Sequence, residues 1–79
     1  MRVEVKLFAT LRKYLPPDAK NKTVTLALAD GQTVGDALDA AGVPRSEAHL
    51  LILNGDNRSP DHLLQDGDTL SVFPPVAGG

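Results

Sequence analysis

Two kinds of apolar periodicity occur along this sequence, and the order in which they occur constrains the fold more than any other feature. Residues 2–8, 23–28, 49–53 and 68–73 each have the length and the apolar or alternating composition of a strand. Residues 33–44 instead place apolar side chains three and four positions apart, which is typical of an amphipathic helix. The predicted order is therefore strand, strand, helix, strand, strand.

The same periods predict which side chains enter a core. Alternation with polar neighbours assigns one set to the inner face of the strands: Val3, Val5, Leu7, Val24, Leu26, Leu28, Leu70 and Val72. On the helix the inner set is Val34, Ala37, Leu38 and Ala41. Thr33 is the expected N-cap and Gly42 the expected C′ residue, and Pro44 prevents the helix from continuing.

The segments between these elements are predicted to be short turns and loops. Residues 9–15 have room for about one and a half helical turns before a proline pair stops them. Residues 49–53 are expected to form a short buried strand that ends at the turn Asn54–Gly55. Residues 56–65 are expected to be a loop with one helical turn near His62–Leu64.

This order of elements predicts the topology of the sheet. A hairpin, a crossover helix and a strand that returns beside the first give a small mixed sheet packed on one main helix. That α+β arrangement is the β-grasp plan of ubiquitin, in which the first and last strands are neighbours. A chain of 79 residues supports one core, so we expect one domain over residues 1–75 and a flexible C-terminal tail over residues 76–79.

Composition argues against several classes of function. The sequence contains no Cys, which removes disulfides, thiolate metal sites and a cysteine nucleophile or persulfide. The formal net charge is −2 and the basic residues are scattered along the chain, which argues against direct nucleic-acid binding. No signal segment opens the sequence, and no apolar run approaches the roughly 20 residues that span a bilayer. We expect a cytoplasmic protein without membrane contact.

The last seven residues, FPPVAGG, have features that a core does not need. Pro74 and Pro75 lack a backbone N–H and have a fixed φ, so they end strand pairing and direct the following residues away from the sheet. Gly78 and Gly79 have no Cβ, so this segment fits a narrow partner pocket and leaves its carbonyl open to close approach. The carboxylate of Gly79 is ionised at neutral pH and must be activated before it can react as an electrophile.

The segments KLFATLRKYL, DHLLQ and DGDTLSVFPPVAGG resemble the small subunit of molybdopterin synthase, in a sulfur-carrier family that includes the thiamine sulfur carrier and archaeal ubiquitin-like modifiers. The resemblance covers the whole chain and implies a β-grasp fold with a protruding glycine tail. It implies that an adenylyltransferase of the ubiquitin-activating type uses ATP to adenylate Gly79. A sulfur donor enzyme then displaces AMP, and a terminal thiocarboxylate remains. In this interpretation Gly79 and the adjacent Gly78 form the catalytic site, and the chain itself binds no cofactor.

The resemblance leaves the final acceptor open. The favoured hypothesis is delivery of sulfur to the pterin precursor of the molybdenum or tungsten cofactor, in a complex with the large subunit of molybdopterin synthase. The Phe-Pro-Pro segment favours this hypothesis, because thiamine carriers usually lack it. The alternatives keep the chemistry at Gly79 and direct it to thiamine synthesis, to tRNA thiolation or to protein lysines through an isopeptide bond. A third reading is a β-grasp interaction module whose tail takes no part in a reaction.

Counting along the strands predicts where a partner docks. If the alternating valines and leucines point inward, Phe8 and Phe73 both point to the opposite face of the sheet. Because the first and last strands are neighbours, the two rings should form an exposed apolar patch beside the tail, with Arg12 close by. The predicted partner-binding set is completed by Pro74, Pro75, Val76 and Ala77. Residues 56–58 depart from the family, which often has an aliphatic residue after the Asn-Gly turn.

Other candidate groups carry simpler interpretations. His49 and His62 are separated in the sequence and lack a second ligand type nearby, so they are expected to be surface residues and no metal site is predicted. Asp61, Asp66 and Asp68 lack the spacing of a calcium loop, and turn chemistry explains them better. No acid–base pair is evident, so the chain is expected to be non-catalytic on its own.

Overall fold

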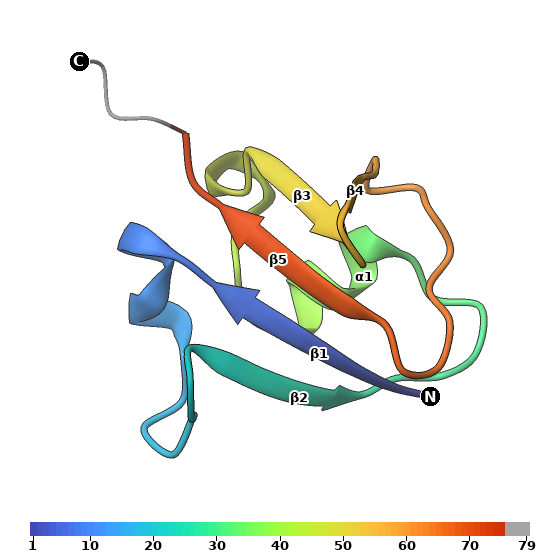
Figure 1. Ribbon diagram of the computed structural model, residues 1–79, viewed down its shortest axis with the longest axis horizontal. Helices are drawn as coiled ribbons and strands as arrows, with labels where there is room; N and C mark the ends of the chain where they lie inside the picture. The colour runs from blue at the N-terminus through green and yellow to red at the C-terminus, as the bar shows by residue number, and fades with distance from the viewer. Residues whose placement is uncertain (76–79) are drawn as a thin grey trace.

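The computed structural model describes residues 1–75 of the chain. Within them, five strands form one mixed sheet, an α-helix lies across one face of it, and two 3₁₀ helices join the elements (Figure 1). In chain order the elements are β1 (Arg2–Leu7), η1 (Ala9–Tyr14), β2 (Thr23–Ala27), α1 (Val34–Ala40), η2 (Arg45–Glu47), β3 (Leu50–Leu53), β4 (Asp56–Asn57) and β5 (Thr69–Phe73).

The strand order across the sheet is β2-β1-β5-β3-β4. The central pair, β1 and β5, runs parallel with Leu7 opposite Val72, and the other neighbours are antiparallel. Figure 1 shows these two strands side by side in the middle of the sheet. The predicted α+β fold, a ubiquitin-like β-grasp, is confirmed, including the pairing of the first and last long strands.

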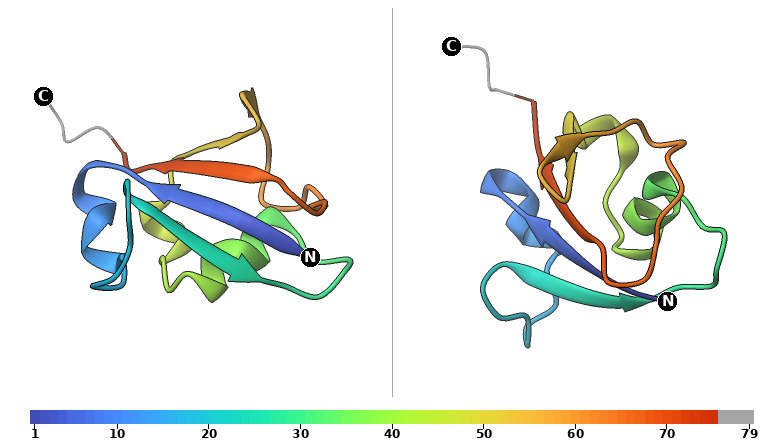
Figure 2. Two further views of the ribbon diagram at one scale, coloured as in Figure 1. Left: turned by 60° about the horizontal axis from the view of Figure 1, so that its bottom comes forward. Right: turned by 45° about the vertical axis from the view of Figure 1, so that its right-hand side comes forward.

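The core lies between the inner face of the sheet and α1, which Figure 2 shows on one side of the strands. Its buried apolar members are Val3, Val5, Leu7, Leu11, Val34, Ala37, Leu38, Val43, Leu51, Leu53, Leu64, Leu70 and Val72. Burial of each valine or leucine in this set stabilises the fold by roughly 1.5–3 kcal/mol. Val24, Leu26 and Leu28 belong to the edge strand or follow it, and they pack on this core while only partly buried.

Both ends of α1 follow the predicted chemistry. The Thr33 hydroxyl accepts a hydrogen bond from the Asp36 N–H at 3.2 Å, and the Asp36 carboxylate accepts one from the Thr33 N–H at 2.9 Å, which together form a capping box. Gly42 follows the C-cap with φ +77°, a left-handed conformation that glycine adopts without strain.

Residues 60–64 differ from the prediction, because they contain no helical turn at His62–Leu64. The carbonyls of Pro60 and His62 instead accept hydrogen bonds from Gly35 N–H and Val34 N–H, at 2.8 and 2.9 Å. Leu63 pairs with Thr33 in an isolated bridge. This segment supplies carbonyl acceptors for N–H groups in the first turn of α1, which have no partner within the helix. A helical turn at His62–Leu64 would use such carbonyls for its own hydrogen bonds.

The segment after β3 also differs from the predicted loop. Asp56 and Asn57 form the two-residue strand β4, which pairs with Leu53 and Ile52 after the Asn54–Gly55 turn. Two residues carry too little alternation for a strand to be predicted from the sequence, so this segment was expected to be a loop.

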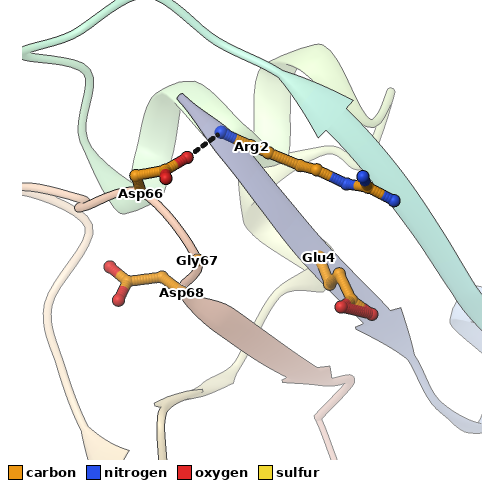
Figure 3. Close-up of a pocket in the computed structure, with 5 residues that line it drawn as sticks. All are labelled: Arg2, Glu4, Asp66, Gly67 and Asp68. Atoms are coloured by element: carbon orange, nitrogen blue, oxygen red, sulfur yellow. Dashed lines mark hydrogen bonds between the residues drawn. The ribbon is translucent and has the colours of Figure 1, made fainter.

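A turn at residues 65–68 joins the start of β5 to the start of β1 (Figure 3). Arg2 N–H donates to the Asp66 carboxylate at 2.7 Å, and Gly67 N–H donates to the Arg2 carbonyl at 2.8 Å. Glu4 N–H donates to the Asp68 carbonyl at 2.9 Å. Arg2, Glu4, Asp66, Gly67 and Asp68 line a hollow of about 130 Å³ at this turn.

Asp68 is a charged residue that is buried, and each oxygen of its carboxylate accepts a hydrogen bond. It accepts from Asn54 Nδ2 and from Gln65 N–H, both at 2.8 Å. Asn54 Oδ1 in turn accepts from Thr69 N–H at 2.9 Å. The carboxylate therefore ties the β3–β4 turn to the start of β5, as the predicted turn chemistry requires.

Replacing Asp68 with Ala is expected to destabilise the fold by about 2 kcal/mol, because an amide of Asn54 and a backbone N–H lose a charged acceptor in a buried place. Urea denaturation monitored by circular dichroism measures this difference. Asp61→Ala is the matched control, since Asp61 is exposed in the same loop region, and its effect should stay within about 0.5 kcal/mol. Equal effects of the two variants would contradict the assigned role of Asp68.

Candidate functional site

Two aromatic rings stack on the outer face of the sheet where β1 and β5 end. The ring centroids of Phe8 and Phe73 are 4.5 Å apart and the ring planes are inclined by 9°. Both residues are half-buried and lie opposite the helix-covered face. The predicted juxtaposition of these two rings is therefore present, while their role in binding a partner stays a prediction.

The backbone around Phe8 fixes the position of its ring. Phe8 N–H donates to the Val72 carbonyl at 3.2 Å and extends the pairing of β1 with β5 by one residue. Ala9 then adopts φ 53°, which for a residue with a Cβ costs roughly 1–2 kcal/mol. This left-handed step turns the chain into η1, whose Leu11 is buried in the core. Buried residues next to each ring, Leu7 and Leu11 near Phe8 and Val72 before Phe73, thus hold the stack in place.

A hollow of about 420 Å³ lies beside the stack, at the point where the chain leaves β5. Its lining residues are Ala9, Thr10, His49, Leu50, Phe73, Pro74 and Pro75. Most of these side chains are apolar, and Leu50 is a large apolar residue with 37% of its surface exposed. An exposed apolar hollow next to stacked aromatic rings has the composition of a protein-binding surface.

Leu50 and His49 belong to this site but were not predicted to. The sequence HLLIL indicates a buried strand, whereas in β3 only Leu51 and Leu53 are buried. Leu50 lies opposite Phe73, and His49 N–H donates to the Phe73 carbonyl at 2.9 Å. Because both faces of β3 are apolar, its alternation is invisible in the sequence. Pairing with β5 is the only signal that assigns Leu50 to the outer face.

The predicted residue Arg12 lies on η1, exposed, with Nε donating to the Ala9 carbonyl at 3.2 Å. Its neighbour Lys13 pairs with Glu47 at 3.6 Å. Tyr14 donates its hydroxyl to the same carboxylate at 2.5 Å. η1 is therefore joined to η2 by these contacts, and Arg12 is held next to a residue that lines the hollow.

A lysine that the sequence did not single out also reaches the stack. Lys22 Nζ lies 5.9 Å from the centroid of the Phe8 ring, within the range of a weak cation–π contact. Lys22 has φ 59°, and its carbonyl accepts from Leu7 N–H at 3.0 Å. The loop that precedes β2 thus returns to the end of β1.

Pro74 and Pro75 line the hollow and mark the root of the tail. The predictions on Val76, Ala77, Gly78 and Gly79, including the flexible tail, fall outside the described residues. Among residues 1–75, no group of three or more His, Asp or Glu side chains is placed to hold a metal ion. No helix in this part of the chain is long and apolar enough to cross a membrane.

The fold is that of a ubiquitin-like β-grasp protein. The chain belongs to the Mut7-C ubiquitin family, whose model matches residues 1–78. The family resemblance read from the sequence is thereby confirmed.

Three relatives illustrate the likeness. Small archaeal modifier protein 3 of Haloferax volcanii is 34% identical over an alignment of 97 positions that covers 100% of both chains. The crystal structure of small archaeal modifier protein 1 from the same organism superposes with a TM-score of 0.75 at 31% identity, covering 95% of this chain and 98% of that one. A provisionally named molybdopterin converting factor subunit 1 from Pyrococcus furiosus gives a TM-score of 0.70 at 28% identity, with 95% and 98% coverage.

The contact between Tyr14 and Glu47 predicts an altered titration. Donation of the phenol hydroxyl to the Glu47 carboxylate, followed by burial and charge repulsion, raises the pKa of Tyr14 above its ordinary value near 10.0. The native state holds this proton more tightly than the unfolded chain. The stabilising contribution is therefore present at neutral pH and is lost as the pH rises through the native pKa.

Absorbance of tyrosinate measures this directly, because Tyr14 is the only tyrosine and the sequence has no Trp. Glu47→Gln should lower the Tyr14 pKa toward its ordinary value, because the amide keeps an acceptor but removes the charge. Glu4→Gln, which removes an exposed carboxylate on β1, should leave it unchanged. A wild-type titration at the ordinary value would show that the contact does not persist in solution.

Proposed function

We propose that this chain is a ubiquitin-like modifier whose Gly79 carboxylate is activated by an adenylating partner and then joined to protein lysines. The full-length match to small archaeal modifier protein 3 carries this proposal, because that relative is named a modifier and aligns over all of both chains. The structural likeness to small archaeal modifier protein 1 adds support. The relatives thus favour conjugation, an alternative left open by the sequence, over delivery of sulfur to a pterin.

The proposed chemistry begins at a group with little reactivity of its own. The Gly79 carboxylate attacks the α-phosphorus of ATP on the partner enzyme, pyrophosphate leaves, and the resulting acyl adenylate is an electrophile. A deprotonated lysine Nζ then attacks the carbonyl carbon and AMP leaves, which forms an isopeptide bond. The lack of a Cβ on Gly78 and Gly79 keeps this carbonyl accessible.

The surface at the root of the tail has a role in this proposal as the docking site for the activating partner. The Phe8–Phe73 stack and the adjacent hollow end at Pro75. Four residues lie between this point and the end of the sequence, and an extended segment of that length spans at most about 14 Å. A partner that covers the stack therefore has Gly79 within reach of its own active site.

Delivery of sulfur to the pterin precursor is the second candidate. The Phe-Pro-Pro-Val-Ala-Gly-Gly segment favours it, and so does the likeness to the Pyrococcus furiosus protein, which is named for molybdopterin conversion. In this route a sulfur donor displaces AMP from the same acyl adenylate, and the large synthase subunit is the partner. Activation of Gly79 is common to both candidates, so the acceptor alone separates them.

Removing Gly79 is expected to abolish activation without changing stability, because the residue lies beyond the described core. The cognate adenylating enzyme, ATP and the purified chain are combined, and ATP–pyrophosphate exchange is measured together with the melting temperature. Asp61→Ala, an exposed change in the body of the protein, should retain full exchange. Exchange that survives deletion of Gly79 would refute the proposed chemistry.

The acceptor is then read by mass spectrometry of the products. Arg58 is the last basic residue in the sequence, so trypsin should leave residues 59–79 attached to a modified lysine. Finding this remnant on target proteins supports conjugation. An oxygen-to-sulfur exchange at Gly79, without such remnants, would instead support the sulfur carrier.

Truncation of Phe73 tests the docking site separately from the chemistry. Phe73→Ala is expected to weaken binding of the adenylating enzyme by about 2 kcal/mol if the ring is a hot spot, with little loss of fold stability because the ring lies outside the core. Leu63→Ala is the matched control, since Leu63 is 61% exposed and lies in the loop beside the N-terminus of α1. Isothermal titration calorimetry compares the two, and similar affinities would contradict the assignment of this surface.

A further inference from the structure

We infer that the partner surface which covers the Phe8–Phe73 stack is acidic, because three unpaired cations, Lys6, Arg12 and Lys22, lie around the rings. These three residues form a basic rim. The inference rests on the proposed function, since it specifies the chemistry of the partner that docks at the same site. It concerns electrostatic selection and rate of association, which the apolar stack alone does not provide.

The two signs of charge are unevenly distributed along the chain. Residues 6–22 contain five basic side chains and one carboxylate, a net charge of +4. Residues 23–75 contain two basic side chains, Arg45 and Arg58, and eight carboxylates. The overall charge of −2 therefore conceals a positive segment next to a negative remainder.

The topology brings this positive segment to the root of the tail. β1 and β5 run parallel, so the end of β1, η1 and the loop to β2 lie at the same end of the sheet as Pro74 and Pro75 (Figure 1). Lys6 is two residues before Phe8, and its register partners on the outer face are Thr23 and Ser71. Scattered positions in the sequence thus converge on one surface, which composition alone did not indicate.

Contacts place two of the cations near the stack, and the alternation of β1 places the third on the same face. Lys22 Nζ is 5.9 Å from the Phe8 ring centroid. Arg12 Nε is bonded to the carbonyl of Ala9, which lines the apolar hollow. Lys6 shares the outer face with Phe8 by the period of the strand, and Glu4 is the carboxylate that precedes it on this face.

Three of the five Lys and Arg side chains outside the rim form ion pairs within residues 1–75, and the rim residues form none. Within residues 1–75, the ion pairs of the side chains use Lys13, Arg45 and Arg58, which contact Glu47, Asp39 and Asp56 respectively. None of these pairs involves Lys6, Arg12 or Lys22. The cations of the negative remainder are thus neutralised within the chain, whereas those around the stack keep their charge available to a partner.

A protein surface fits this arrangement better than a nucleic acid does. The stack beside the rim also lines a mostly apolar hollow of about 420 Å³ through Phe73, which suits an apolar side chain of a partner that carries carboxylates nearby. A polyanion would also approach the eight carboxylates of residues 23–75. Complementary charges around an apolar centre mainly raise the association rate and exclude partners of the wrong sign.

Charge reversal at two positions tests the inference with a control of identical net charge. The double variant Lys6→Glu/Lys22→Glu, called the rim variant, reverses two of the three rim cations. The control Arg2→Glu/Arg58→Glu reverses two cations outside the rim, at the start of β1 and after β4. Each double variant changes the net charge by the same amount. Stopped-flow measurement of association with the adenylating enzyme that activates Gly79 compares them at low and high salt.

The rim variant should associate roughly tenfold more slowly at low salt, with a weaker salt dependence than the wild type. The control variant should stay close to the wild type, and dissociation rates should change less than association rates. Equal rates for the two variants, or wild-type association that does not respond to salt, would overturn the inference while Gly79 activation and the effect of Phe73→Ala stand. Tighter binding to single-stranded RNA than to the enzyme, lost in the rim variant, would overturn it in favour of a nucleic-acid partner.

Discussion

The parallel pairing of β1 with β5 is the constraint on which the rest of this molecule depends. It places β5 between β1 and β3, so that both edges of this last strand are hydrogen-bonded to a neighbour. It buries Leu70 and Val72 beside Val5 and Leu7. The same pairing brings Phe8 against Phe73 and leaves Pro74 at the end of the sheet from which η1 begins. The core, the Phe8–Phe73 stack and the root of the tail therefore share one structural cause.

Features determined within a few residues of the chain could be predicted from the sequence. The inward residues of β1 and β5 follow from alternation with polar neighbours, and the limits of α1 follow from Thr33 and Gly42. Features that depend on a distant segment of the same chain could not be predicted. The segment at His62–Leu64 has helical composition, yet its carbonyls are used by the N-terminus of α1. β4 exists only because β3 lies beside it. In both places tertiary hydrogen bonds decide the conformation over local preference.

In the candidate site, too, the residues that local alternation determines were predicted, and those that depend on a distant segment were not. Counting by twos assigns Phe8 and Phe73 to one face, and the strand order brings them together. Leu50 was missed because both faces of β3 are apolar, so only its register with Phe73 reveals its direction. Lys22 was missed because its left-handed backbone interrupts the alternation that counting requires. The predictions for Val76, Ala77, Gly78 and Gly79 depend on chemistry that a partner supplies, and the fold of residues 1–75 does not test them.

The directions of β1 and β5 also determine how the domain carries mechanical load. The chain enters at the start of β1 and leaves toward the tail at the end of β5, and the two strands run side by side in the same direction. Tension applied between the N-terminus and a substrate attached at the tail pulls these neighbours in opposite directions along their length. Their hydrogen bonds are then loaded together in shear, whereas an antiparallel hairpin pulled at its open end would lose them one by one. The parallel pairing of β1 with β5 therefore resists force applied between the two ends of the domain better than a hairpin pulled at its open end would.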